Sequence, residues 1–208
     1  NGGDASGIYI IGSLVTSLTN GLITNLYGGA GNTTNDGSSQ IGNGGDASGF
    51  TVISTICELF NTTVSDCMGG AGGLGDTSLD GGLGGDSTGV LLNTSSNYGL
   101  LFGITVNCQG GQGGYPNGEP GLGTGMQSRI GYIFTYNNVW GNDQNYWRCE
   151  PGEGCISMDP IFVMRPDYMS FYLSHLDAGQ SHTSPCSDAG NIPAKQVFTD
   201  ENYTTRTD

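Results

Sequence analysis

Short runs of apolar and β-branched residues alternate with polar, glycine-rich stretches along residues 1–141. The clearest runs occupy residues 8–15, 50–56, 90–92 and 99–106. Runs rich in Ile, Val, Thr and aromatic residues, bounded by Gly, Ser and Asn, are typical of β-strands. The pattern predicts an all-β chain whose short strands are separated by long glycine-rich loops.

Two glycine-rich blocks recur at a nearly constant spacing. Gly-Gly-Asp-Ala-Ser-Gly begins at Gly2 and Gly44, and Gly-Gly-Asp-Ser-Thr-Gly begins at Gly84. A second block, Gly-Gly-x-Gly, begins at positions 28, 69 and 110, which are 41 residues apart. Such a period indicates stacked copies of one supersecondary unit. We therefore expect neighbouring repeats to pair strand to strand, with a shorter fourth repeat at residues 129–141.

Aligning the repeats predicts which side chains stack in columns. Ile8, Phe50 and Val90 form one predicted column. Because alternate residues of a strand point the same way, three further columns are expected to share the interior face. These are Leu22/Thr63/Ile104, Thr24/Ser65/Val106 and Leu26/Cys67/Cys108, with Val139 of the short repeat below Cys108. The intervening Asn25, Asp66 and Asn107 are expected to form a hydrogen-bonded polar ladder or to cap the turn.

The glycine runs admit two interpretations. In GGAGGLG, GGLGGD and GGQGG, glycine occupies nearly two of every three positions. Glycine permits close backbone approach and extended threefold helices, so these segments can pack as a layer beside the strands. The alternative is a set of flexible surface loops.

Charge and composition exclude several partner classes. The formal net charge is −14, and all five basic residues follow Ser128. A repeat region without a cation repels nucleic acid and anionic lipid. No apolar run is long enough to span a bilayer. We therefore predict no nucleic-acid partner and no membrane span.

Cysteine content and glycosylation motifs favour an extracellular or cell-surface location. The chain has six cysteines, and Asn-x-Ser/Thr sequons suit a secreted protein. The predicted glycosylation sites are Asn32, Asn61, Asn93 and Asn202. Asn1 aligns with Asn43, so the sequence begins in register with its own repeat. This predicts either further repeats upstream or association of another copy with the uncapped edge.

The chain resembles the right-handed parallel β-helix proteins of the pectin-lyase-like superfamily in their secreted repeat forms. The GIYI and GGxG pattern carries the resemblance over residues 1–141, and GCISMDPIFV and SPCSDAGN carry it near the C-terminus. It implies a right-handed parallel β-helix, a solenoid with coils over residues 1–141. Residues 142–208 are then an irregular C-terminal closing segment of the same domain.

The residues favour a non-catalytic member. A lyase of this fold needs a Lys or Arg base, which residues 1–128 lack, and a hydrolase needs closely spaced carboxylates. No paired-aspartate motif is present. His175 and His182 flank Asp177, which suggests either a base with its orienting carboxylate or a structural loop. We predict no catalytic residue.

One candidate metal site lies in the repeat. Asp4, Asp46 and Asp86 occupy equivalent positions, so their carboxylates can form a Ca²⁺-binding ladder with turn carbonyls. The alternative is a turn aspartate that accepts local backbone N–H groups. Calcium is the only cofactor that this pattern suggests.

The cysteines allow more than one pairing. Cys67 and Cys108 fall in one column, about 4.8 Å apart if strands stack in register, which permits a disulfide. Cys149 and Cys155 bracket a short loop that a second disulfide can close. Cys57 and Cys186 then remain unpaired, or Cys57 pairs with Cys67 instead.

Together these features predict an extracellular structural or adhesive module. It is expected to assemble end to end or to belong to a longer surface or filament protein. The alternative is a carbohydrate-active enzyme or polysaccharide-binding protein that uses the aromatic residues of the C-terminal part; core packing is the other explanation for them. These residues are Tyr132, Phe134, Tyr136, Trp140, Tyr146, Trp147, Phe162, Tyr168, Phe171 and Tyr172.

Overall fold

A computed structural model describes most of the chain, in two compact units, Asn1–Ser157 and Met158–Asp208. The described residues are 1–12, 15–33, 41–53, 56–76, 79–93, 100–101, 103–129, 133–164 and 169–187. The boundary after Ser157 places residues 142–157 with the repeats.

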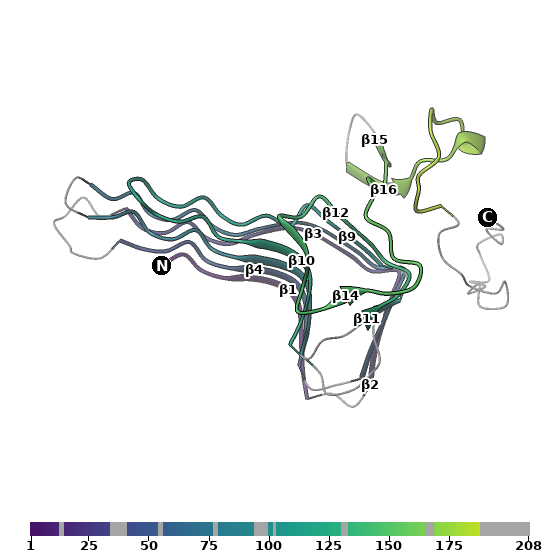
Figure 1. Ribbon diagram of the computed structural model, residues 1–208, viewed down its shortest axis with the longest axis horizontal. Helices are drawn as coiled ribbons and strands as arrows, with labels where there is room; N and C mark the ends of the chain where they lie inside the picture. The colour runs from purple at the N-terminus through teal and green to yellow at the C-terminus, as the bar shows by residue number, and fades with distance from the viewer. Residues whose placement is uncertain are drawn as a thin grey trace. The chain divides into compact units, whose positions relative to one another are not determined.

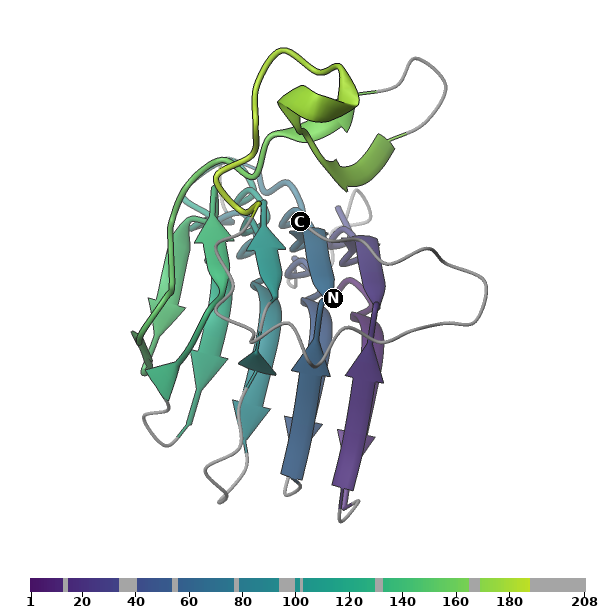
Figure 2. The ribbon, with the colours of Figure 1, turned by 90° about the vertical axis from the view of Figure 1, so that its right-hand side faces the viewer.

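The first unit is built from parallel sheets to which the repeats contribute strands in turn (Figure 2). The first sheet has the order β1-β4-β7-β10-β13. Its strands are β1 (Ala5–Ile11), β4 (Ala47–Ile53), β7 (Ser87–Asn93), β10 (Gly123–Ser128) and β13 (Gln144–Trp147). Every pairing in this sheet is parallel. Adjacent strands therefore come from successive repeats.

Two further parallel sheets and one strand pair complete the β-structure of this unit. The second sheet contains β2 (Val15–Thr19), β5 (Ile56–Phe60) and β8 (Leu100–Leu101). The third contains β3 (Leu22–Tyr27), β6 (Thr63–Met68), β9 (Ile104–Val106) and β12 (Asn138–Trp140), and β11 (Ile133–Phe134) pairs with β14 (Glu150–Pro151). The prediction of a mostly β chain with parallel sheets is confirmed.

The hydrophobic core lies between the first and third sheets. Ile8 pairs with Phe50, Phe50 with Val90, Val90 with Met126 and Met126 with Tyr146, so the predicted column is confirmed and extends by two residues. From Phe50 to Met126 its members are buried. Facing them are buried residues of the third sheet, including Val64 and Val139.

The predicted interior face of the third sheet is confirmed at Cys67 and Cys108, which are fully buried, but it is wrong for the column that begins at Leu22. Leu22 is 54% exposed, whereas Ile23 is 8% exposed. The strand does not alternate regularly, because Asn25 has a left-handed φ of 59° and turns the backbone. Ile23 and Leu26 consequently face the same side, where both approach Gly7. The columns themselves stay in the predicted register: Leu22↔Thr63↔Ile104 and Thr24↔Ser65↔Val106.

The placement of Val139 below Cys108 is also wrong. Val139 pairs with Thr105, three positions earlier. Gly141, with a φ of 70°, therefore aligns with Asn107 and extends the column of residues that adopt a left-handed backbone conformation. The side chain of Asn142 then takes the position beyond Cys108, and its Oδ1 accepts the Cys108 N–H at 2.8 Å.

The described glycine-rich segments form two packed layers rather than loose loops (Figure 1). Outgoing segments follow the third sheet at residues 28–33, 69–76 and 110–115, and returning segments precede the first sheet at 1–4, 41–46, 81–86 and 118–122. Glycine N–H groups donate across the layers in a zigzag. One such ladder runs from Gly121 through Gly111, Gly85, Gly70, Gly45 and Gly29 to Gly3, with N···O distances of 2.7–2.9 Å.

Other glycines bond within a layer. Gly31 N–H donates to Ala71 O, and Gly72 N–H donates to Gln112 O. Two of every three residues therefore face a neighbouring segment, and the third projects to solvent. This is the geometry of extended threefold helices, so the packed-layer hypothesis is confirmed for the described segments.

Glycine is required where neighbouring segments of one layer approach each other. A Cβ built on Gly70 lies 2.0 Å from Gly29 O, and one built on Gly45 lies 2.3 Å from Gly3 O. Both obstacles are backbone atoms, which cannot rotate away. At Gly3, in contrast, an added Cβ meets nothing within 4 Å.

The second unit is smaller. An antiparallel pair, β15 (Phe162–Met164) and β16 (Met169–Leu173), brings Phe162 and Phe171 into edge-to-face contact with ring centroids 5.1 Å apart. A 3₁₀ turn, Leu176–Ala178, follows and ends at Gly179, whose φ is 85°. Residues 188–208 lie outside the described residues.

We predict that Gly70→Ala destabilises the fold by about 2–3 kcal/mol, because overpacking against backbone cannot relax. Gly3→Ala is the control, since it changes a glycine of the same hydrogen-bonded ladder at the open edge, where an added Cβ meets nothing within 4 Å. Its expected effect is a slight stabilisation of about 0.4–1 kcal/mol through the unfolded chain. Urea unfolding of both variants measures the difference. Equal stability of the two variants would contradict the packed layers.

Candidate functional site

The returning segments present an acidic outer face. Every third residue projects away from the other layer, and these residues are exposed. A shallow groove of about 290 Å³ crosses this face. Side chains in its lining include Asn43, Asp46, Leu83, Asp86 and Glu119.

The predicted aspartates lie on this face as a ladder. Asp4 Oδ1 accepts the Asp46 N–H at 3.0 Å, and Asp46 Oδ1 accepts the Asp86 N–H at 2.9 Å. Asp86 Oδ1 accepts the Leu122 N–H at 2.8 Å. Each carboxylate thus satisfies the exposed backbone donor of the next repeat. This is the local role expected of a turn aspartate.

The same ladder bears on the calcium hypothesis. Within residues 1–187, as far as they are described, no three His, Cys, Asp or Glu side chains converge on a common metal position. Asp4, Asp46 and Asp86 follow one another along the stack, one per repeat, each with one oxygen engaged by backbone. Calcium at these residues stays a prediction.

The predicted polar ladder of the third sheet is confirmed. Asp66 has a φ of 54° and receives bonds from both neighbouring repeats. Thr24 Oγ1 donates to its Oδ2 at 3.3 Å, and Asn107 Nδ2 donates to its Oδ1 at 3.2 Å. Ser65 Oγ donates to Oδ2 as well. These bonds hold successive left-handed turns in register.

Cys67 and Cys108 are buried free thiols in neighbouring repeats. A side-chain hydrogen bond with Cys67, together with burial, strongly raises the pKa of the Cys108 thiol. Both thiols pack toward glycines of the first sheet, and a Cβ on Gly89 would lie 2.9 Å from Cys108 Sγ. The expected proximity is therefore present, while the disulfide stays a prediction. The side chain of Cys57 lies outside the described residues.

Cys149 and Cys155 are also free thiols, and each lies close to a backbone carbonyl. Cys149 Sγ donates to Met126 O at 3.2 Å, and Cys155 Sγ donates to Phe134 O at 3.1 Å. Tyr146 packs with both thiols. Burial is the main cause that raises the pKa of the Tyr146 hydroxyl, and the neighbouring Cys155 thiol is the second cause. Burial also raises the pKa of the Cys149 thiol to about 11. Their predicted disulfide is untested.

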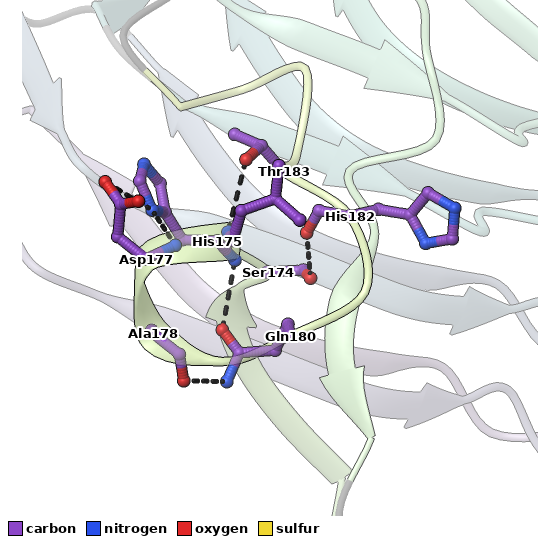
Figure 3. A network of polar contacts seen from close by, with 8 residues as sticks. Ser174, His175, Asp177, Ala178, Gln180, His182 and Thr183 are labelled. Atoms are coloured by element: carbon purple, nitrogen blue, oxygen red, sulfur yellow. Dashed lines mark hydrogen bonds and ion pairs between the residues drawn. The ribbon is translucent and has the colours of Figure 1, made fainter.

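Of the two histidines that flank Asp177, only His175 lies beside its carboxylate (Figure 3). His175 Nδ1 accepts the Asp177 N–H at 3.2 Å, which caps the 3₁₀ turn, and it lies 3.9 Å from Asp177 Oδ2. The His182 ring points elsewhere, and its Nδ1 lies 2.8 Å from Ser181 Oγ. Ser174 Oγ donates to the His182 carbonyl. This arrangement supports the structural-loop interpretation.

Three predicted glycosylation sites fall on described residues. Asn32 is exposed at the end of an outgoing segment, and Asn93 ends β7. Asn61 is exposed with a φ of 47°, and its Nδ2 donates to Asn20 Oδ1 at 2.6 Å. Asn202 lies outside the described residues.

The aromatic residues of the C-terminal part do not share one role. Phe134 is fully buried in the core, while Trp147 is partly exposed under Arg148, whose guanidinium carbon lies 4.5 Å from the ring centroid. Tyr172 is exposed in the second unit. Tyr132 and Tyr168 lie outside the described residues.

The sequence analysis missed the residues that close the last repeat. Asp143 Oδ2 accepts the N–H groups of Gly110 and Gly123, both at 2.8 Å. Asn142 accepts the Cys108 N–H in the same region. An Asn-Asp pair directly after a strand and a left-handed glycine is the signal for such a cap.

We predict that Asp46→Asn keeps or raises stability, because the amide Oδ1 still accepts the Asp86 N–H and one of the stacked like charges is removed. Asp46→Ala loses the acceptor and is expected to cost about 1 kcal/mol. Unfolding with added CaCl₂ and with EDTA tests the calcium hypothesis. A calcium-dependent stability that Asp46→Asn abolishes would establish the metal site instead.

We predict slow alkylation of Cys149 in the folded protein. Its pKa of about 11, against an ordinary value of 9.0, leaves about a hundredth as much thiolate near pH 8 as in the unfolded chain. Iodoacetamide labelling followed by peptide mass spectrometry should give a rate that rises until about pH 11. If Cys149 is instead protected from alkylation at every pH, and reductant removes that protection, a disulfide is established.

No helix in the described part of the chain has the length and apolarity needed to cross a bilayer. No protein-family model matches the chain, and comparison with curated proteins and with solved structures gives no significant match. The likeness to the pectin-lyase-like superfamily therefore rests on the sequence motifs alone.

Proposed function

We propose that the chain is a structural and adhesive module of a secreted or cell-surface protein, built as a right-handed parallel β-helix. Each repeat supplies one strand to each of three parallel sheets in succession, which supports a helical course. Right-handed crossovers between parallel strands are the rule for L-amino acids, which supports the hand. The acidic, cysteine-containing composition supports the location.

The open edge of the first repeat is the observation that carries this proposal. Gly3 belongs to a column in which the later members, Gly45, Gly85 and Gly121, each face a carbonyl of the preceding repeat at 2.0–2.3 Å from an added Cβ. Gly3 faces open space. A glycine is entropically unfavourable where nothing requires it. Its presence is explained if another repeat packs on this edge.

The burial of the first-sheet strands supports association at the same edge. β1 and β4 share the sequence Ala-Ser-Gly at their start, yet β4 is largely buried and β1 is largely exposed. Tyr9 and Ile11 of β1 are exposed large hydrophobic residues. An unpaired strand edge with apolar side chains favours the addition of another strand.

The opposite end of the repeats differs. There, Asp143 accepts the N–H groups of Gly110 and Gly123, and Asn142 accepts that of Cys108. Three of the backbone donors that another repeat would use are thus already satisfied. Association of isolated chains is therefore proposed to pair two first repeats edge to edge, which stops at a dimer. In a longer protein, a preceding repeat would occupy the edge.

Sedimentation velocity over a range of protein concentrations tests the proposal. We expect a reversible dimer at high concentration, strengthened by salt because each copy carries a net charge of −14. Gly3→Ala should weaken dimerisation at least tenfold while thermal stability is retained, since its methyl group projects only into the interface.

Gln112→Ala is the control for this experiment, because it truncates an exposed side chain distant from the edge and should leave dimerisation unchanged. A chain that stays monomeric at all concentrations would refute edge association. Dimerisation unaffected by Gly3→Ala would place the interface elsewhere.

A further inference from the structure

The outgoing glycine segments carry an uncharged outer face that the sequence motifs did not predict. Every third residue from the end of the third-sheet strand onward projects away from the returning layer, and three segments together display a three-by-three grid, here called the neutral face. Its residues, all exposed, are Tyr27, Ala30, Thr33, Met68, Ala71, Leu74, Gln109, Gln112 and Tyr115.

Backbone bonds fix the register of the grid. Tyr27 pairs with Met68, and Met68 pairs with Gln109. Farther along the segments, Gly72 N–H donates to Gln112 O and Gly75 N–H donates to Tyr115 O. Rows are therefore about 4.8 Å apart across segments and about 9 Å apart along them. Because the backbone groups are satisfied, the face is ordered before any ligand binds.

Large side chains remain open to solvent on this face. Tyr115 is 80% exposed, Tyr27 56%, Leu74 55% and Met68 39%. None of the nine residues is charged. The carboxylates of Asp4, Asp46, Asp86 and Glu119 project from the returning segments instead. The two outer surfaces of the glycine layers thus differ sharply in charge.

Area argues against a second copy as the occupant. The grid measures about 28 Å by 14 Å, or about 400 Å² per molecule, from the spacings above. A stable protein interface buries about 800 Å² on each partner.

The side-chain chemistry fits a sugar polymer. Gln109, Gln112 and Tyr115 follow one another along a single segment. Exposed tyrosine rings present flat apolar surfaces with a polar edge, which suit the C–H face of a pyranose. The glutamine amides offer both donors and acceptors to hydroxyl groups. A neutral polymer incurs no charge repulsion at this face.

We propose that the neutral face binds an uncharged polysaccharide strand lying along residues 109–115, with Tyr115 stacking on a sugar ring and Gln112 hydrogen-bonding to hydroxyl groups. This site is independent of the dimer edge proposed above. It specifies the ligand class and position for the polysaccharide-binding alternative drawn from the sequence.

Depletion binding to microcrystalline cellulose, chitin and insoluble β-1,3-glucan tests the proposal, with polygalacturonate gel as the anionic comparison. We expect saturable binding to at least one neutral polymer and none to polygalacturonate. Tyr115→Ala and Gln112→Ala should each weaken binding at least fivefold, and the double variant should abolish it. Thermal stability should stay unchanged, because only exposed side-chain atoms are removed.

Glu119→Gln is the matched control, since it changes an exposed residue on the opposite face and should leave binding unchanged. Absence of binding to all three neutral polymers would overturn the proposal. Binding that Tyr115→Ala leaves intact, or that Glu119→Gln weakens equally, would also overturn it. A dimer that Tyr115→Ala dissociates would identify the face as a protein interface.

Discussion

Backbone hydrogen bonding between glycines of opposite layers is the constraint on which the structure depends. Glycine-rich chain is entropically expensive to order, and its N–H and C=O groups need partners once they are enclosed. The ladder from Gly121 to Gly3 supplies those partners at 2.7–2.9 Å. Such close approach is possible only without Cβ atoms, since a Cβ built on Gly44 would overlap Gly70 O of the opposite layer.

The sheets and the glycine layers depend on each other for register. Parallel strands place successive repeats about 4.8 Å apart, and the glycine segments continue from the strands with the same spacing. Gly28 N–H donates to Met68 O where β3 and β6 end, so one hydrogen-bonded series runs from sheet to layer. Side-chain ladders reinforce it: Asp66 links Thr24 to Asn107, and Asp46 links Asp4 to Asp86.

In this architecture, the residues that pack the layers differ from those that form the outer surfaces. In the glycine segments, two of every three residues pack against neighbouring segments. The third projects outward, where Asp46 and Asp86 also accept backbone N–H groups of the next repeat. The outward side chains thus give one scaffold two different surfaces, the acidic face and the neutral face. A similar asymmetry distinguishes the ends of the repeats, since Asp143 satisfies backbone donors at one end and Gly3 faces solvent at the other.

Sequence by itself determined the repeat, the β-strand content and the strand register of the first three repeats, because periodicity and residue type report directly on local structure. The columns of Phe50 and Thr63 follow from alignment alone. It did not determine that Leu22 faces solvent while Ile23 is interior, because the left-handed turn at Asn25 interrupts the alternation. The tertiary structure also decided the role of the glycine runs and of Asp46. The Asp86 N–H that Asp46 accepts lies 40 residues away, and the glycine partners of the ladder between the layers lie 10 to 26 residues away, so only stacking brings each donor to its acceptor.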